Sequence, residues 1–194
     1  MMQKFAKLIR FITVPPLVVS AELLLLLCFE DVFPHLADFW LALFFLAILP
    51  ALAYPLQKLI PQLRGGGQKA QRRLAFILSP VGYIGALVCA VLRDAVPNLL
   101  YIAAVYLLSV ILLLLFNRFT PLHASGHGCS VSGSIILPCL FLGGYALIPG
   151  VLLFGLSFWA SVYLKRHTVR EFLLGAAIAA LSALICYFPI SPAF

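Results

Sequence analysis

The sequence predicts an all-helical bundle that crosses a membrane several times, and three observations support this fold class. Of its 194 residues, 64% are hydrophobic and 10% are charged, whereas a soluble domain carries charge on about 25% of its residues. Seven apolar stretches each approach the ~20 residues that a membrane-spanning helix requires. None of them alternates polar and apolar residues as a half-buried strand does. We therefore expect one integral membrane domain over residues 1–194.

The first four predicted spans are 11–29, 39–60, 75–93 and 98–117. The first follows a basic N-terminal segment but precedes no small-residue cleavage site, so we interpret it as a retained span and not as a signal peptide. Prolines interrupt the first three, which neighbouring helices in a membrane bundle tolerate by satisfying the freed backbone groups. The fourth is almost continuous hydrocarbon and is the plainest span.

The last three predicted spans are 124–143, 148–165 and 169–189. A polar break that begins near Arg118 separates the fourth span from the fifth, and "GGYALIPG" forms the hairpin before the sixth. The sixth ends at a basic cluster. The seventh starts after Thr168, a residue type that caps helix N-termini.

The distribution of charge predicts an orientation. Basic residues gather in the N-terminal segment and around the "RGGG" of the 58–73 connector, whereas the 30–38 connector carries Glu30, Asp31 and Asp38 without Lys or Arg. The positive-inside rule places the N-terminus in the cytoplasm. Seven spans then bring the connectors near Arg118 and Lys165 to the cytoplasmic side, with the C-terminus outside. The net charge of +7 lies in short loops, so it indicates membrane orientation and not binding of nucleic acid.

Two further groups of residues have simpler interpretations. The five cysteines lie in apolar runs and form no CxxC pair, which is typical of packing residues and not of a disulfide or metal framework. Glu22 lies within the first span, where an ionisable residue is a functional candidate by default. We favour a structural, hydrogen-bonded role for it.

The polar break before the fifth span contains residue types that bind an anion. In "HASGHG", small residues open a helix whose free backbone N–H groups and dipole attract negative charge. Nearby cations add the donors that phosphate prefers. His127 can protonate a leaving oxygen. The candidate phosphate-binding residues are Ser125, Gly126, Arg118, Lys165, Arg166 and His123.

A second cluster, "KRHTVRE", follows the sixth span. Glu171 comes four residues after His167, so the two side chains share one helical face. A carboxylate there accepts from one imidazole nitrogen and leaves the other free to act as a nucleophile. Together the two clusters provide the positioning and charge stabilisation that phosphoryl transfer requires without a metal or other cofactor.

These motifs resemble those of the type 2 phosphatidic acid phosphatase (PAP2) superfamily. Ser125-Gly126-His127 resembles the core of its P-S-G-H motif, and the segment from Ser161 to Glu171 is similar to its S-R-x5-H-x3-D motif. The spacing of the two histidines fits one helical hairpin, as in that family. The resemblance covers about residues 116–180, and it implies a PAP2-like six-helix core within about seven spans.

The resemblance also implies an activity and roles. The protein is expected to be a metal-independent lipid-phosphate phosphatase of the bacterial plasma membrane. Phosphatidic acid, phosphatidylglycerol phosphate, a lipid A phosphate and a prenyl diphosphate are the candidate substrates. His167 is expected to attack phosphorus and form a phosphohistidine, with Glu171 orienting it in place of the usual Asp. His127 is expected to protonate the leaving alcohol, and Ser125 and Gly126 to hold the phosphate.

The chain departs from the family pattern at three places. Ala124 stands where the motif has proline, Ser161 stands where it has arginine, and the K-x6-R-P motif is not recognisable. From the residues themselves, we expect Arg118 or His123 to replace the missing motif and the basic pair at 165–166 to replace the missing arginine.

Two other functions fit the sequence. His123 and His127, four apart on one helix, together with His167, form a possible ligand set for an intramembrane zinc hydrolase. That interpretation leaves the surrounding cations unexplained. The missing motif residues are also compatible with a catalytically degenerate membrane transporter or scaffold.

Overall fold

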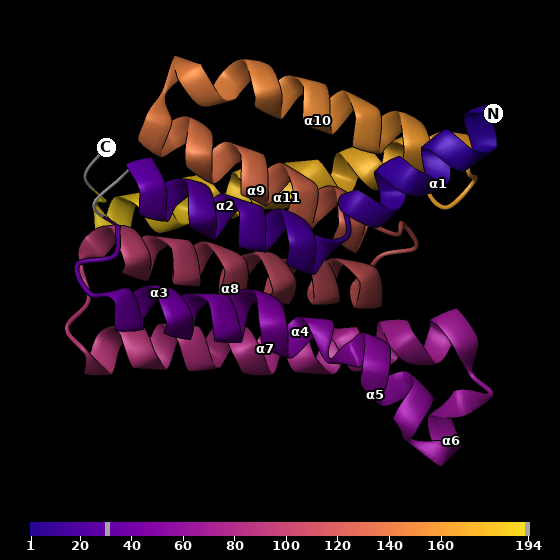
Figure 1. Cartoon of the computed structure of the whole chain (residues 1–194), viewed down its shortest axis with the longest axis horizontal. Coiled ribbons are helices and arrows are strands. Elements are labelled where there is room, and N and C mark those ends of the chain that lie inside the picture. The colour runs from indigo at the N-terminus through magenta and orange to yellow at the C-terminus, as the bar shows by residue number, and fades with distance from the viewer. Residues whose placement is uncertain (30–31, 193–194) are drawn as a thin grey trace.

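The computed structural model describes residues 1–29 and 32–192, and this part of the chain is helical and contains no strand. The expectation of an all-α protein is confirmed. Figure 1 shows the long helices running side by side. The helices are α1 (Met2–Ile12), α2 (Pro15–Phe29), α3 (Leu36–Leu43), the π-helix η1 (Phe44–Ile48), α4 (Leu49–Ala51), α5 (Ala53–Leu59), α6 (Pro61–Arg64), α7 (Gly67–Leu92), α8 (Pro97–Phe119), α9 (Gly126–Leu142), α10 (Gly144–Tyr163) and α11 (Val169–Ile190).

Among the described residues, five helical segments are long and apolar enough to cross a membrane, and α1 with α2 forms a sixth if the bent pair is one span. The sequence predicted seven. When the bent pair is counted as one span, the difference is the predicted span 124–143, because α9 has 17 residues and is one of the shorter apolar helices. The hairpin before α10 is also tighter than expected. Only Gly143, with φ of +62°, separates α9 from α10.

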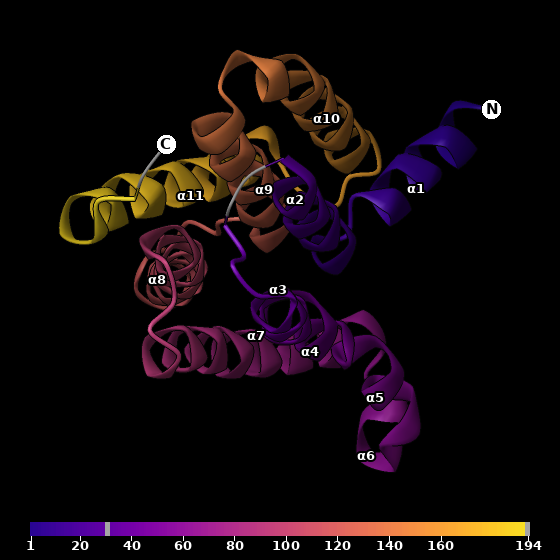
Figure 2. The ribbon, with the colours of Figure 1, turned by 60° about the vertical axis from the view of Figure 1, so that its left-hand side comes forward.

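The first predicted span is two helices that meet at an angle of 57°. The break falls at Thr13 and Val14, directly before Pro15 and Pro16. Proline has no backbone N–H and disfavours a helical conformation in the residue before it. The Thr13 hydroxyl donates to the carbonyl of Ile9 at 2.8 Å and so closes α1. Helix α1 therefore leaves the axis of α2 and packs against α10 (Figures 1 and 2).

The second predicted span is also interrupted, although Leu36–Leu59 as a whole is long enough to cross. A π-helical turn at Phe44–Ile48 is followed by two short helices that contain Pro50 and Pro55. A π-turn and a proline both remove regular i to i−4 hydrogen bonds and bend a helix. This irregular segment packs against α7 and α2. It ends in α5 and α6, which protrude at one corner in Figure 1.

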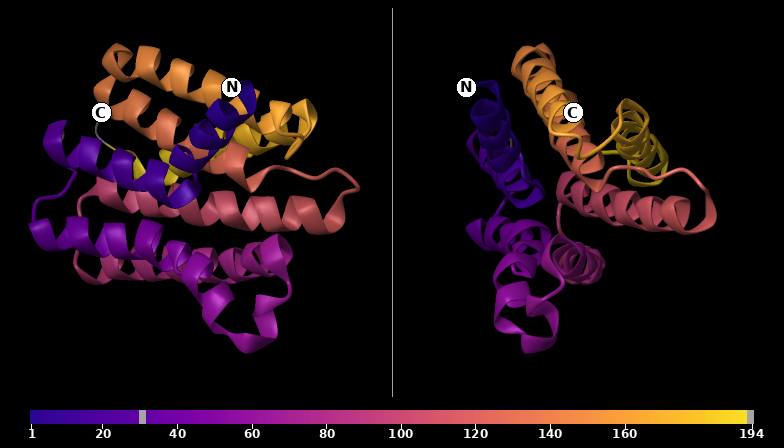
Figure 3. Two further views of the ribbon diagram at one scale, coloured as in Figure 1. Left: turned by 45° about the vertical axis from the view of Figure 1, so that its right-hand side comes forward. Right: turned by 90° about the vertical axis from the view of Figure 1, so that its right-hand side faces the viewer.

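Helix α9 connects most of the C-terminal half of the bundle, because it packs against α2, α8, α10 and α11. Close packing with α11 depends on two glycines. A Cβ at Gly128 would lie 2.6 Å from the carbonyl oxygen of Phe172, and a Cβ at Gly175 would collide with the carbonyl of Ser125. Figure 3 shows the N-terminal ends of α9 and α11 close together at one end of the molecule.

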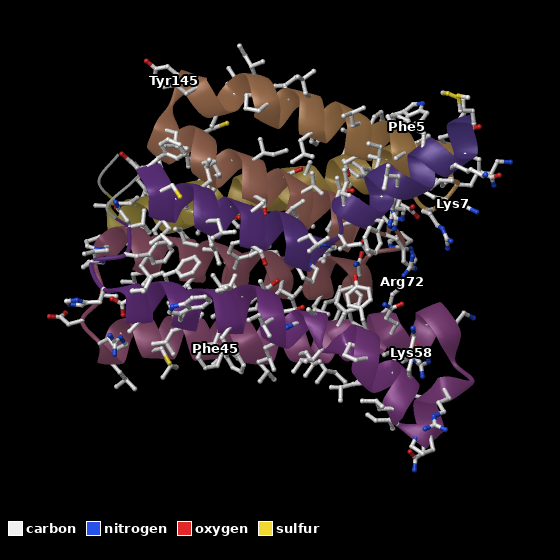
Figure 4. The ribbon with its side chains drawn as sticks, viewed as in Figure 1. Phe5, Lys7, Phe45, Lys58, Arg72 and Tyr145 are labelled. Carbon is white, nitrogen blue, oxygen red and sulfur yellow. The ribbon has the colours of Figure 1, made fainter. Side chains whose placement is uncertain are left out.

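The two ends of the bundle differ in their charged residues. In Figure 4, Lys7, Lys58 and Arg72 lie toward one end, whereas Tyr145 lies at the other. Asp38 at the start of α3 pairs with Arg93 at the end of α7, with 2.6 Å between Oδ1 and Nε. Glu30 and Asp31, which the predicted orientation also used, lie outside the described residues.

Glu22 occupies the interior of the bundle with 3% of its surface exposed. The hydroxyl of Tyr106 donates to its Oε2, and that hydroxyl lies 3.0 Å from Ser134 Oγ. The cluster joins α2, α8 and α9, and interhelical hydrogen bonds of this kind stabilise membrane bundles. Glu22 is hydrogen-bonded to polar neighbours, as the structural interpretation expects.

Candidate functional site

A cavity of about 580 Å³ opens among the helices that carry the two histidine clusters. Seven of its lining residues carry charged or imidazole side chains and come from α1, α7, α9, α11 and two connectors. They are Arg10, Arg72, His123, His127, Arg166, His167 and Glu171.

The charge balance of this cavity favours an anion. Three guanidinium groups line it, and Glu171 is the one carboxylate among its described lining residues. Arginine forms planar, charge-assisted hydrogen bonds with phosphate and carboxylate oxygens. Like charges in one partly buried cavity repel one another unless a ligand of opposite charge lies between them. A phosphate group would remove that repulsion.

The N-terminus of α9 is built by local hydrogen bonds. Ser125 is the N-cap, and its hydroxyl accepts from the backbone N–H of Gly128 at 3.1 Å. The Asn117 side chain fixes the preceding loop, because its Oδ1 accepts from Ala124 N at 2.6 Å and its Nδ2 donates to Ala124 O at 3.1 Å. Asn117 also lines the cavity. The helix begins where the sequence predicts, with Gly126 in the cavity wall.

The two clusters are held together through the backbone. The N–H of Ser125 donates to the carbonyl oxygen of Glu171 at 2.8 Å. The small side chains at Gly128 and Gly175 allow this approach, since a Cβ at either position would meet backbone atoms of the other helix. This contact brings the two clusters together, and His127 and His167, forty positions apart in the sequence, line the same cavity.

His167 is positioned by the first turn of α11. Thr168 and Glu171 form a capping box, in which Thr168 Oγ1 accepts from Glu171 N at 3.2 Å and Glu171 Oε2 accepts from Thr168 N at 2.9 Å. The same carboxylate oxygen lies 3.6 Å from Nδ1 of His167. Glu171 thus faces Nδ1, as its position four residues later predicts, and leaves Nε2 for another partner.

The surroundings of His167 keep its imidazole neutral. The pKa of His167 is lowered from 6.5 to about 4, mainly by burial and then by the guanidinium groups of Arg10 and Arg72, while Glu171 opposes this. A neutral imidazole has the lone pair that a nucleophile needs. His167 is therefore neutral throughout the neutral pH range.

His127 is more enclosed than His167. Its Nε2 lies 3.0 Å from Ser157 Oγ of α10 and 3.4 Å from Thr13 Oγ1. Because Thr13 gives its hydroxyl proton to a backbone carbonyl, the neutral tautomer that suits these partners carries its proton on Nε2. Phe172 packs edge-on against the ring, with centroids 6.2 Å apart. The ring is held in place before any ligand binds.

Two of the charged residues that line the cavity, Arg10 and Arg72, were not among the predicted site residues. Arg10 Nη1 donates to Ser161 Oγ at 3.0 Å, at the position where the resembling motif has arginine. The backbone carbonyl of Ser161 accepts from Arg166 N at 3.0 Å. A guanidinium from α1 thus lies against the end of α10. From the sequence, both arginines were used only to predict the orientation in the membrane. Because that orientation places them on the same side as the two histidine clusters, they could have been predicted as site residues.

Three predicted phosphate ligands do not line the cavity. Arg118, in the last turn of α8, is exposed, and Lys165, with φ of +51°, is exposed in the connector before α11. Ser125 is 1% exposed, and its hydroxyl serves as the helix cap. Gly126, His123 and Arg166 do line the cavity.

The geometry does not form the zinc site considered above. His123 lies in the loop before α9 and not on a helix with His127, because α9 begins only at Gly126. In residues 1–29 and 32–192, no three His, Cys, Asp or Glu side chains form a group able to hold a metal ion. The five cysteines, all within that part, are unpaired.

Comparison with known proteins provides no relative for this chain. No protein-family model matches it, and neither a curated protein nor a solved structure does.

Proposed function

We propose that the protein is a lipid-phosphate phosphatase that works through a phosphohistidine on His167. The single observation that carries this proposal is the cavity that Arg10, Arg72 and Arg166 line together with a neutral imidazole, His167, which Glu171 faces. The PAP2 resemblance supports the same function. The substrate lies in the membrane, so the chain acts on a lipid partner and not on nucleic acid.

The reaction proceeds in two displacements. Nε2 of His167 attacks phosphorus, the bond from phosphorus to the ester oxygen breaks, and the leaving alkoxide takes a proton from His127. The phosphate that enters carries the negative charge that supports protonated His127. Water then gives a proton to His127 and attacks the phosphohistidine. The P–N bond breaks, and inorganic phosphate and free His167 result.

The remaining site residues orient His167 and stabilise the charge of the phosphate. Glu171 holds the His167 ring through Nδ1. The arginines stabilise charge on the phosphoryl oxygens, which is the main requirement of phosphoryl transfer. Arg10 takes the position of the motif arginine through its bond to Ser161. The N–H groups at the start of α9 add an anion site.

We also propose a location. The protein is a multi-pass protein of a bacterial plasma membrane with a cytoplasmic N-terminus, and the cavity opens on that side. The charges in the connectors support this orientation. Cysteine accessibility at positions 122 and 169, which flank the two clusters, distinguishes the two sides.

The test is phosphate release from a panel of lipid phosphates in nanodiscs that contain EDTA. The wild-type protein should turn over at least one of them, and His167→Ala should not. His35→Ala is the matched control, because His35 lies before α3 and does not line the cavity. Dependence on added metal, or full activity of His167→Ala, contradicts the proposal.

One observation favours a second candidate, a protein that binds lipid phosphate without hydrolysing it. Nε2 of His127 already lies within 3.0 Å of Ser157 Oγ, so the proton donor has a competing partner. The two candidates differ in one measurement, since a binder retains lipid phosphate and never carries a phosphoryl group on His167.

A further inference from the structure

The cavity continues from its charged mouth into the interior of the bundle, and the lining changes along the way. The mouth carries the arginines and histidines. Further in, the described lining carries apolar side chains such as Phe76 from α7, Leu46 from η1 and Val105 from α8, together with the hydroxyl groups of Ser79 and Ser109. An amphipathic cavity of this kind suits a ligand with a charged head and a hydrocarbon chain.

The length of the cavity follows from the helices that line it. Along α8 it runs from Asn117 to Val105, and along α7 from Gln71 to Tyr83. Each interval is twelve residues, which at about 1.5 Å per residue is roughly 18 Å. The hydrocarbon core of a bilayer is about 30 Å thick, so a cavity of this length corresponds to more than half of that thickness. Tyr83 and Tyr106 lie at the inner end, with ring centroids 5.5 Å apart.

Gly133 marks open space in this inner part. It is buried in α9 and lines the cavity, yet a Cβ built on it would meet no atom within 4 Å. Gly128, five residues earlier on the same helix, has no such room, because its Cβ would lie 2.6 Å from a backbone oxygen. Protein interiors are normally filled by side chains. A buried glycine next to empty volume therefore indicates a space kept for a ligand.

The volume limits what this space accepts. About 580 Å³ is within the ~300–1,000 Å³ range of pockets that enclose one small-molecule ligand. A phosphate head and one hydrocarbon chain fit this volume, whereas a second long chain has no room. We propose that the protein selects a phosphate ester with a single hydrocarbon chain, and that the chain lies inside the bundle between α7, α8 and α9. This inference rests on the proposed function, because it assigns the substrate of that same site.

The experiment fills the inner cavity and leaves the mouth unchanged. Gly133→Leu places a side chain in the open space. Gly155→Leu is the matched control, because Gly155 also lies within a helix and has no atom within 4 Å of its Cβ, but it is exposed on α10 and does not line the cavity. Both variants and the wild type are assayed in nanodiscs with dodecyl phosphate, butyl phosphate and phosphatidic acid. Gly133→Ala gives a smaller intrusion and should have an intermediate effect.

We expect the wild type to prefer dodecyl phosphate over phosphatidic acid. Gly133→Leu should lower kcat/KM for dodecyl phosphate by about tenfold or more, since a methylene-sized misfit in an apolar pocket costs at least about that factor. Butyl phosphate, too short to reach Gly133, should be hydrolysed as by the wild type. Gly155→Leu should match the wild type on all three substrates. Equal rates on one-chain and two-chain substrates, or an unchanged chain-length preference in Gly133→Leu, overturn the inference and leave the proposed function standing.

A binding measurement distinguishes failure of the proposed phosphatase activity from failure of the proposed chain site. Dodecylphosphonate cannot be hydrolysed, so its effect on the thermal unfolding temperature reports binding alone. The wild type and Gly155→Leu should be stabilised more by dodecylphosphonate than by butylphosphonate, and Gly133→Leu should lose this difference. If no ester is hydrolysed but this pattern appears, phosphatase activity is wrong and the chain site is retained. If the pattern is absent, the chain site is wrong.

Discussion

Glu171 has two roles that substitution can separate. Its carboxylate closes the capping box of α11 through Thr168 N, and the same oxygen faces Nδ1 of His167 at 3.6 Å. Glutamine also serves at this position of a capping box, but it carries no charge. Glu171→Gln should therefore preserve the helix end and remove the charged partner of His167. Thr168→Ala should do the reverse, because it removes the hydroxyl that caps Glu171 N.

The two variants should differ in how much thermal stability and how much activity they lose. Loss of a threonine N-cap costs about 1 kcal/mol, which in a protein of this size lowers the unfolding temperature by roughly 2–4 °C. A catalytic group displaced by about 1 Å loses roughly 10²-fold in rate. We expect Thr168→Ala to lower the unfolding temperature and retain most phosphatase activity. Glu171→Gln should retain the unfolding temperature and lose activity by about that 10²-fold factor.

Thermal unfolding and lipid-phosphate hydrolysis are measured on the same nanodisc preparations. Equal losses of activity in both variants would show that Glu171 acts only through the helix end. That outcome would refute the assignment of Glu171 as the group that orients His167.

Three further predictions concern the cavity and the packing around it. In a histidine NMR titration, His167 should titrate with a pKa near 4. Arg72→Gln should raise that pKa, because removal of a cation favours the protonated ring. The contribution of the neutral His167 ring to the free energy of unfolding is present above pH 6.5 and is lost as the pH falls toward 4. If Arg10 supplies the guanidinium that the motif has at position 161, Arg10→Ser should abolish activity and the added change Ser161→Arg should restore part of it. Wild-type activity in Arg10→Ser would contradict this role of Arg10. Gly175→Val should prevent close packing against the carbonyl at the start of α9 and so lower the yield of folded protein; wild-type yield and activity would contradict the packing.

The features that depend on short sequence intervals were predictable. Helical fold class follows from apolar length and the absence of alternation. The cap at Thr168 and the pairing of His167 with Glu171 depend on three- and four-residue spacings that any helix imposes. The start of α9 at Ser125 and Gly126 followed for the same reason.

The features that depend on tertiary packing were not predictable in the same way. Arg10 reaches Ser161 only because α1 turns away from α2 and packs along α10, and no local pattern encodes that contact. The bend itself had a local signal, since the prolines at 15 and 16 disfavour a continuous helix. Arg118 is near the site in sequence, but its position on α8 turns it outward.

The covalent intermediate tests the central claim most directly. Wild-type protein mixed rapidly with a lipid phosphate and quenched in alkali, which preserves phosphohistidine, should yield a peptide that carries one phosphoryl group on His167. His127→Ala should form this species more slowly and also hydrolyse it more slowly, because His127 protonates the leaving alkoxide in the first step and takes a proton from water in the second. Turnover of the substrate without phosphorylation of His167, or with the phosphoryl group on another residue, would contradict the account.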